Sequence, residues 1–567
     1  MTKLFKVAFL VDDYDVDFYT YDLIKHVSQS ELFENPVVIT GYQHKVKKSN
    51  AALRVILLLK KIGFIKFINL VLFLSLYRFI KKIELRSVLK TRPEYILEKS
   101  LTLIDRLKFI SIIGIWSKSK KNLSLTNDDV EIIENENIDV IIRCGSGILK
   151  GKILDISTFG VLSFHHGDNR VNRGGPFGFW EVFNSNPSSG FIIQKLNNEL
   201  DGGDVLFRGG IVTAGIWTLN SANLLAKSNI FMKEILDQIA TKRKLPEFEL
   251  PCLHDRPLYK IDNTSSLFIK YIFKVYVPIV IRKIRAGIFG QKFGRWSIGY
   301  SKFDGYKSSL WRYQEVKNPP NRFLADPFIF SSKGRTVIFA EDFFFTDNRG
   351  RISAIELTNN RENFLGVVLE EDFHLSFPFV FEDNGRIYMV PETHESNQIR
   401  LYECEEFPLK WKFKKTLINN VSAADSMLIK QGDTWFMLTN ICSAKIDDHQ
   451  SELHIFYSKK LITSNWKPIA QGNPVLFDSM RARNGGMFTY ENRLYRVNQV
   501  QSKGYYGRAF EINLVTQIDK CCYKEIHIDR VEPFFKDDIV STHHFSSNSD
   551  YSVVDFLRMV SKQERNK

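Results

Sequence analysis

The second half of the chain repeats one pattern five times. Each unit has an apolar strand, a turn of Gly, Asn, Asp or Ser, and a second apolar strand, as in Asp326–Phe330 followed by Val337–Asp342. The units begin at positions 326, 377, 425, 485 and 543, so their spacings are 51, 48, 60 and 58 residues. A period of about 50 residues with paired strands is typical of propeller blades. The repeats predict an all-β five-bladed β-propeller over residues 294–567.

The first half alternates between strand and helix patterns. Short apolar runs predict buried strands at 5–11, 36–40 and 138–142, and mixed runs predict helices at 18–28, 147–156, 176–184 and 219–239. Short, continuously apolar strands that alternate with helices are typical of a parallel sheet covered on both faces. We therefore expect residues 1–250 to form an α/β Rossmann-like parallel sheet domain.

Two stretches are both basic and apolar: 52–90, an insertion in the first domain, and 267–292, within an expected linker at 251–293. They contain nine and six Lys or Arg residues against one acid, and they account for the whole net charge of +14. Their spacers are apolar, whereas nucleic-acid binders favour polar spacers, so we expect no nucleic-acid partner. The apolar run Asn69–Tyr77 is far shorter than the roughly 20 residues of a membrane span.

Besides a transmembrane helix, two interpretations of these stretches remain open. A basic amphipathic helix would lie on an anionic membrane surface, and an ordinary helical insertion would pack on its own domain. The apolar run at the N-terminus is too short for a secretory signal. Six cysteines are too few for a disulfide scaffold, and because no pair has metal-ligand spacing we expect no metal site. The expected location is the cytoplasm, with peripheral binding to the inner face of the membrane as its extension.

The first domain carries one dense polar motif. It is Gly160-Val-Leu-Ser-Phe-His-His-Gly-Asp168, followed by Arg173-Gly174-Gly175 and then by Leu200-Asp201-Gly202-Gly203-Asp204. A histidine that follows a buried strand can lie at the carboxyl edge of a parallel sheet, where α/β proteins bind ligands. A carboxylate beside that histidine would orient the imidazole and stabilise its cation.

These residues resemble the formyltransferase family in their order and spacing. The resemblance implies transfer of a formyl group from 10-formyltetrahydrofolate to the amine of a nucleotide-linked amino sugar. His165 would assist proton transfer at the amine with support from Asp201, and Ser163 stands where the family has an Asn that donates to the oxyanion. Arg173 and Gly174 would bind substrate. Another transfer reaction on the same scaffold, or a fold without catalysis, remains an alternative.

Polar residues recur at equivalent positions of the repeats in the second half. Asp326, Asp425 and His543 each stand at the start of the first strand of their unit, and Glu392 ends a second strand. Because blades direct the beginnings of their inner strands to a central funnel, these side chains are expected to meet at one axis. Two carboxylates that flank a cleft are what glycoside hydrolysis requires. We therefore expect these four residues to bind a sugar or act on it.

The repeats resemble the five-bladed propellers of arabinanase- and xylosidase-type glycoside hydrolases, and also the hydrolase-like N-terminal domain of plant glucosamine inositolphosphorylceramide transferases. The motifs that carry the resemblance are Leu324-Ala325-Asp326-Pro327-Phe328, Ser376–Glu382, Tyr388–Glu392 and Arg493–Arg496. The resemblance implies a propeller that handles sugars. Sugar binding without hydrolysis, glycosyl transfer or hydrolysis, and pure scaffolding all remain open.

The combined interpretation is an enzyme of surface-polysaccharide biosynthesis. Its first domain would N-formylate an amino sugar, its propeller would bind the glycan or nucleotide sugar, and its partner would be an amino-sugar nucleotide or a lipid-linked sugar. The main alternative is a glycosyltransferase or glycosidase-like enzyme whose chemistry lies in the propeller. A second alternative is a non-catalytic sugar-binding protein. The variants His165→Ala and Asp326→Ala separate these cases by which of them abolishes product.

Overall fold

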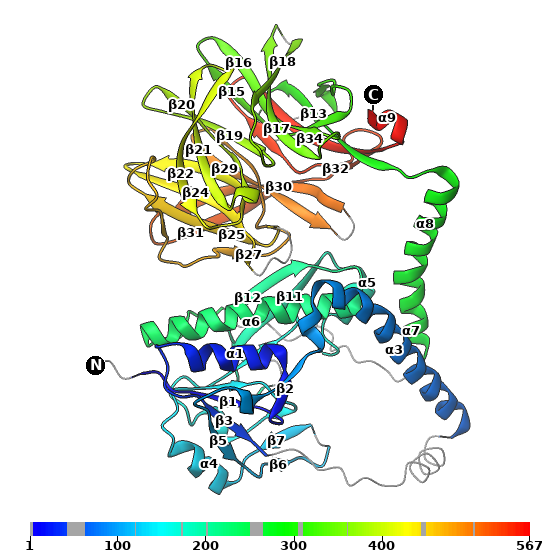
Figure 1. Cartoon of the computed structure of the whole chain (residues 1–567), viewed down its shortest axis with the longest axis vertical. Coiled ribbons are helices and arrows are strands. Elements are labelled where there is room, and N and C mark those ends of the chain that lie inside the picture. The colour runs from blue at the N-terminus through cyan, green and yellow to red at the C-terminus, as the bar shows by residue number, and fades with distance from the viewer. Residues whose placement is uncertain are drawn as a thin grey trace. The chain divides into compact units, whose positions relative to one another are not determined.

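The chain forms two compact units, Met1–Ile279 and Val280–Lys567, and Figure 1 labels many of their elements. The computed structural model describes residues 4–41, 63–119, 121–171, 174–199, 202–249, 265–303, 305, 310–359, 361–443, 449–502 and 505–566. The boundary between the units falls inside the stretch 251–293, which the sequence marks as a linker.

The first unit is built on a seven-stranded sheet with the order β12-β11-β10-β8-β1-β3-β5. Its strands are β1 (Val7–Leu10), β3 (Val37–Thr40), β5 (Lys108–Ser111), β8 (Val140–Arg143), β10 (Val161–His165), β11 (Ser188–Lys195) and β12 (Asp204–Val212). The strands from β10 to β5 run parallel, and β11 and β12 continue the sheet antiparallel. Every residue of β1, β3 and β8 is buried, which explains why these strands are apolar except at Thr40 and Arg143.

Helices and short strands surround this sheet. The α-helices are α1 (Phe18–Gln29), α4 (Asn127–Glu134), α5 (Phe179–Asn184) and α6 (Trp217–Lys242). Asp17 caps α1, and Thr126 and Asp129 form a capping box at the start of α4. The remaining elements are β2 (Asp15–Asp17), β4 (Glu98–Ser100), β6 (Ile115–Trp116), β7 (Asn122–Ser124), η1 (Pro93–Ile96) and η2 (Leu101–Leu103). Helix α6 packs against both α1 and β11.

The helix expected at 147–156 is wrong. This segment contains β9 (Ile148–Leu149) and the 3₁₀ turn η3 (Lys152–Leu154). Gly147 and Gly151 have φ angles of +81° and +86°, whereas an α-helix requires a negative φ at each residue. The apolar residues that gave the segment its helical pattern pack instead into the core of the sheet.

The two basic stretches are helical where the structure describes them. They comprise α3 (Phe64–Thr91), and then α7 (Ser265–Tyr271), the π-turn η4 (Ile272–Tyr276) and α8 (Val277–Phe289). The wide π-turn ends two residues before Pro278, whose ring is incompatible with a regular preceding α-turn. Residues 42–62 and 251–264 lie outside the described residues. Among the described helices, none combines the length and the apolar character needed to cross a membrane.

A buried carboxylate joins α3 to the second basic stretch. Glu84 is 1% exposed and accepts hydrogen bonds from the backbone N–H of Thr218 and from the hydroxyls of Tyr271 and Tyr276, at 2.6–2.8 Å. Burial raises the pKa of both tyrosines, and the nearby charge of Glu84 raises it further, so both remain hydroxyl donors. These bonds fix α3 to the body of the first unit.

The second unit is a β-propeller of five sheets, which confirms the all-β prediction for this half. The first two blades contain β15 (Arg322–Ser332), β16 (Arg335–Phe344), β17 (Arg349–Thr358) and β18 (Arg361–Leu369), then β19 (Ser376–Asp383), β20 (Arg386–Glu392), β21 (Gln398–Glu406) and β22 (Lys410–Asn419). The next two contain β23 (Ala423–Gln431), β24 (Thr434–Ile441), β25 (Glu452–Ser458), β26 (Lys467–Pro468) and β27 (Leu476–Phe477), then β28 (Asn484–Tyr490), β29 (Arg493–Ser502), β30 (Tyr505–Ile518) and β31 (Tyr523–Val531).

The fifth blade combines both ends of the propeller sequence. It contains β13 (Phe293–Lys302), β14 (Gln314–Glu315), β32 (Ile539–Ser541), β33 (Phe545–Ser547) and β34 (Tyr551–Val560). Strand β13 pairs antiparallel with β34 along its whole length, from Phe293 opposite Val560 to Lys302 opposite Tyr551. The first strand of the unit therefore closes the ring by joining the last. Short helical elements are η5 (Leu310–Arg312), η6 (His394–Ser396) and α9 (Lys562–Asn566).

Candidate functional site

Four blades interrupt their first strand with a β-bulge at the same register. The pairing shifts lie between Ala325 and Phe328, Ser376 and Phe379, Ala424 and Met427, and Asn484 and Gly486. In three of these bulges a residue other than Gly has a positive φ: 47° at Asp326, 46° at Phe377 and 49° at Asp425. This conformation is uncommon outside Gly, and a bulge re-aims a side chain. The repeated bulge therefore takes Asp326 and Asp425 out of the regular alternation of their strands.

A second set of polar residues lies on the second strands, opposite the bulges. In the first four blades these residues are Glu341, Glu392, Asn440 and Asn498. Asp555 of β34 has the corresponding place in the fifth blade, because Thr542 Oγ1 donates to its carbonyl oxygen and the backbone N–H of His543 donates to its carboxylate. All five are 7% exposed or less. The repeats thus place polar side chains at equivalent positions of all five blades.

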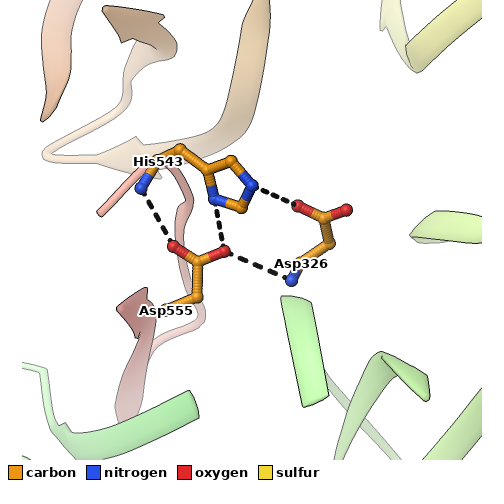
Figure 2. A group of neighbouring side chains, drawn as sticks. All are labelled: Asp326, His543 and Asp555. Atoms are coloured by element: carbon orange, nitrogen blue, oxygen red, sulfur yellow. Dashed lines mark hydrogen bonds and ion pairs between the residues drawn. The ribbon is translucent and has the colours of Figure 1, made fainter. Parts of the chain in front are cut away.

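Figure 2 shows Asp326, His543 and Asp555 in one buried group. His543 Nδ1 lies 2.5 Å from Asp555 Oδ2, and His543 Nε2 lies 3.7 Å from Asp326 Oδ1. The backbone N–H of Asp326 donates to Asp555 Oδ2 at 3.3 Å, while Asp326 Oδ1 accepts no hydrogen bond from the described residues. One imidazole therefore stands between two carboxylates that come from the first and fifth blades.

Burial and charge act in opposite directions on this group. Burial, together with the nearby Asp555, raises the pKa of Asp326 to about 6, although the His543 cation opposes the shift. For His543, burial favours the neutral ring, but the charge of Asp555 and its hydrogen bond outweigh burial and raise the pKa. Burial likewise disfavours the Asp555 carboxylate, yet His543 holds its pKa below the usual value. Asp555 is therefore ionised at neutral pH, whereas the pKa of Asp326 lies close to neutral pH.

Aromatic rings fix the plane of the central imidazole. Trp296 stacks on His543 with ring centroids 4.1 Å apart, and Tyr506 meets the same ring edge-on at 5.4 Å. One ligand atom each of Asp326, His543 and Asp555 lies within 4.8 Å of the others, so these three residues could hold a metal ion. A carboxylate that binds one imidazole nitrogen and leaves the other available is also the arrangement that orients a proton-transfer histidine.

A second buried group joins Glu392 to Asp425 through Arg483. Arg483 Nε donates to Asp425 Oδ2 at 2.7 Å, and its Nη2 lies 3.7 Å from Glu392 Oε2. His394 Nδ1 lies 2.6 Å from the other oxygen of Glu392. Burial would raise the pKa of Glu392, but His394 and Arg483 outweigh it and hold the pKa far below the usual range. Burial and the Glu392 charge raise the pKa of Asp425 despite Arg483.

The structure brings the four propeller residues of the sequence prediction into these two groups. Asp326 meets His543, and Glu392 meets Asp425 by way of Arg483. Sequence reasoning missed Arg483 and Asp555. Asp555 could have been found by aligning the second strands of the repeats, since it matches Glu392 there. Arg483 directly precedes β28, outside the part of the repeat that recurs, and no sequence signal identifies it.

The residues predicted in the first unit are only partly within the described chain. His165 ends β10, and Ser163 lies two positions before it on the same face, at the carboxyl end of the parallel strands. Gly174 is described and has a φ of +100°. Arg173 and Asp201 lie outside the described residues, so the pairing of His165 with Asp201 stays a prediction.

One comparison with known proteins gives a match within the propeller region. The family model described as "Glucosamine inositolphosphorylceramide transferase 1, N-terminal" matches residues 312–538. This chain is similar to two proteins named glucosamine inositolphosphorylceramide transferase 1. It is 31% identical to the protein of Arabidopsis thaliana over 263 residues and 33% identical to the protein of Oryza sativa subsp. japonica over 215 residues. These alignments cover 41% and 37% of this chain but only 34% and 28% of the relatives. The chain thus spans about a third of the length of these relatives.

Solved glycoside hydrolases also align with the chain at low similarity. The catalytic domain of Coprinopsis cinerea GH62 α-L-arabinofuranosidase is 13% identical with a TM-score of 0.32, covering 47% of this chain and 98% of that one. An exo-1,5-α-L-arabinanase from a bovine ruminal metagenomic library is 12% identical with a TM-score of 0.31, covering 42% of this chain and 93% of that one.

The expectation of a sugar N-formyltransferase is wrong. The curated relatives are named as glucosamine inositolphosphorylceramide transferases and not as formyltransferases. The expectation of 10-formyltetrahydrofolate as the cofactor is wrong for the same reason. The sequence pattern misled because glycines and one histidine at the end of a parallel strand fit many ligands, so the fold does not specify the chemistry.

Proposed function

We propose that this chain is a glycosyl-transferring enzyme whose chemistry takes place at the carboxylates of the propeller. The observation that carries the proposal is a pair of equally buried carboxylates with opposite pKa shifts. Asp326 has a pKa of about 6, whereas the pKa of Glu392 is held far below its usual range. Reactions at a glycosidic bond require one carboxyl group that can carry a proton and another that stays ionised. Asp326 and Glu392 meet these two requirements.

Each group has a role that follows from its surroundings. Asp326 transfers the proton, because its pKa lies near neutral pH and its Oδ1 accepts no hydrogen bond from the described residues. Glu392 stabilises positive charge that develops on the sugar. Arg483 and Asp425 position Glu392, and the pair of His543 and Asp555 tunes the charge next to Asp326.

The names of the relatives support a sugar acceptor that is linked to a lipid. They are named glucosamine inositolphosphorylceramide transferases, and the family model of that name matches residues 312–538 of the propeller. A sugar nucleotide as donor and an inositol phospholipid or sphingolipid as acceptor are therefore the first substrates to assay.

The low exposure of the site favours a second function, sugar binding without bond cleavage. Asp326, Glu392 and Asp425 are only 7%, 6% and 1% exposed, which leaves little of each carboxylate for a reacting sugar. In that case the carboxylates would hold the blades together, and a ligand would contact the rim residues, such as the 38% exposed Tyr506.

The test is an assay of the purified chain with sugar nucleotides and lipid-linked acceptors, read by mass spectrometry of the lipid product. Asp326→Asn and Glu392→Gln are expected to lower kcat by about 100-fold or more, with sugar binding retained in calorimetry. Asp342→Asn is the matched control, because Asp342 is a buried carboxylate that pairs with Arg322 and Ser353 instead. Binding without any product would favour the second function, and neither binding nor product across the panel would overturn both.

A further inference from the structure

Helix α3 has one face that is fixed to the protein. Its buried residues are Phe73, Ile80, Glu84 and Val88, spaced seven, four and four residues apart. Phe73 and Ile80 pack in a cluster with aromatic residues of α5, α6 and α7, and Glu84 accepts the three hydrogen bonds described above. The orientation of α3 about its own axis is therefore determined within the first unit.

A separate stripe of α3 is apolar and exposed. Its residues are Ile65, Ile68, Leu72, Phe79 and Ile83, with exposed fractions of 82%, 49%, 44%, 58% and 39%. Their spacings of three, four, seven and four residues place them along one side of the helix. Soluble proteins seldom leave a contiguous row of large apolar side chains in water, and such a row marks an interaction surface.

The exposed side of α3 carries only positive charge. Arg78, Lys82, Arg86 and Lys90 follow each other at intervals of four residues, and all four are exposed. The one acidic residue of the helix is Glu84, which is buried. Lys and Arg near an anionic lipid surface each contribute about 1 kcal/mol of attraction. An apolar row beside a row of basic residues is the pattern of a helix that lies in a membrane interface.

Helix α8 repeats this pattern independently. Val280, Ile281, Ile284 and Ile288 share one side of the helix and are 52%, 44%, 54% and 68% exposed. The basic residues Arg282, Lys283 and Arg285 lie on the remaining circumference, and no residue of α8 is buried. The second basic stretch has no acidic residue between positions 265 and 292.

We propose that the exposed faces of α3 and α8 dock the protein on an anionic phospholipid surface. The apolar side chains enter the boundary between headgroups and acyl chains, while the Lys and Arg side chains contact lipid phosphates. A second copy of the chain fits either helix face poorly, because it would bring the same uncompensated positive charge against itself. The inference does not depend on the proposed function, although a lipid-linked acceptor would be presented at such a surface.

Flotation of the full chain with lipid vesicles tests the proposal. We expect the protein to float with vesicles of phosphatidylcholine and phosphatidylserine, and far less with phosphatidylcholine alone or in high salt. The combined variant Arg78→Glu, Lys82→Glu and Arg86→Glu should weaken binding by about 100-fold or more. The combined variant Ile68→Ser, Leu72→Ser and Phe79→Ser should also weaken it while leaving the charge unchanged.

The matched control changes the same kinds of exposed residue on the propeller. It combines Lys412→Glu, Lys459→Glu and Phe534→Ser, which alter two charges and one aromatic residue. The side chains of Lys412 and Lys459 are each 73% exposed, and Phe534 is 75% exposed. The control should float like the unmodified protein, and circular dichroism checks that every variant is folded. Equal flotation of the control and both α3 variants would overturn the proposal. A concentration-dependent dimer that the apolar variant abolishes would also overturn it, by assigning the face to a second copy.

Discussion

Asp326 and Glu392 are buried to nearly the same extent, at 7% and 6% exposure, yet their pKa values move in opposite directions. Burial penalises both carboxylates, so the difference arises from their partners. Glu392 has a hydrogen bond from His394 and the charge of Arg483, whereas Asp326 faces His543, whose charge is already engaged by Asp555. One imidazole shared between two acids stabilises one of them at the expense of the other.

The raised pKa of Asp326 predicts how this residue changes the free energy of unfolding with pH. Its pKa is about 6 in the folded chain and 3.8 as the ordinary value, so the folded state binds the proton more tightly. Protonated Asp326 therefore contributes to the free energy of unfolding below about pH 4, and this contribution is lost as the pH rises to about 6. Asp326→Asn mimics the protonated form, so it should match the unmodified protein at about pH 4 and exceed its free energy of unfolding by up to about 3 kcal/mol at pH 7.

Urea unfolding at several pH values measures this difference. Asp129→Asn serves as the control of opposite sign. Burial opposes ionisation of Asp129, but hydrogen bonds from the backbone N–H groups of Ile113 and Gly114 outweigh it and lower the pKa, so this variant should lose stability relative to the unmodified protein as the pH rises. A free energy of unfolding that falls for Asp326→Asn relative to the unmodified protein as the pH rises would contradict the assignment of a raised pKa.

At the scale of elements, the bulges of the first strands decide which residues reach the site. A bulge requires a tight local approach between strands, and Gly486 shows this most clearly. Its φ is +126°, and an added Cβ would lie 2.1 Å from the carbonyl oxygen of Phe545 in the neighbouring blade. No side chain fits there without moving a backbone. The sequence Asn484-Gly485-Gly486 is thus explained by the packing of the fourth blade on the fifth.

We predict that Gly486→Ala destabilises the propeller far more than a glycine substitution without a steric conflict. Gly472 also has a positive φ, of +91°, but nothing lies within 4 Å of its added Cβ. Gly472→Ala should therefore cost about 1–2 kcal/mol from backbone strain alone. Gly486→Ala should cost about 3 kcal/mol more, because the strands must separate as well. Thermal unfolding followed by circular dichroism compares the two, and equal melting temperatures would show that the close approach is absent in solution.

At the scale of the whole molecule, each unit has its own architecture. The first is a mixed sheet with helices, and the second is a ring of five blades closed by β13 pairing with β34. The closing strand also supplies Trp296, which stacks on His543 of the site. Closure therefore has two effects: it removes an exposed strand edge and fixes the central imidazole.

This dual role predicts the behaviour of two fragments. A fragment of residues 292–567 retains β13 and should unfold cooperatively, whereas residues 304–567 would leave β34 as an unpaired edge and should aggregate or lose near-ultraviolet circular dichroism. Removal of residues 562–567 from the longer fragment is the control, because it deletes α9 and leaves the ring closed. Identical cooperative unfolding of the two fragments would show that β13 is dispensable for closure.

Much of this organisation could be predicted from particular residues. The repeated pairs of strands located the blades, and the recurrence of Asp326, Asp425 and His543 at equivalent positions of the repeats indicated that these side chains gather in one region. The helical pattern at 147–156 failed because Gly147 and Gly151 have positive φ angles, a property that apolar periodicity does not contain. The formyl-transfer interpretation failed because a motif on a common sheet does not determine the reaction.

The sequence by itself determined the blades and the candidate carboxylates, because strand period, turn residues and repeat spacing are local properties of the chain. Only the tertiary structure decided which carboxylate has a raised pKa and which has a lowered one. That outcome depends on burial and on charges carried by residues from different blades: Arg483 lies 58 residues after Asp425, and Asp555 lies 229 residues after Asp326. Electrostatic energy depends on distance through space, and the order of residues along the chain does not record that distance.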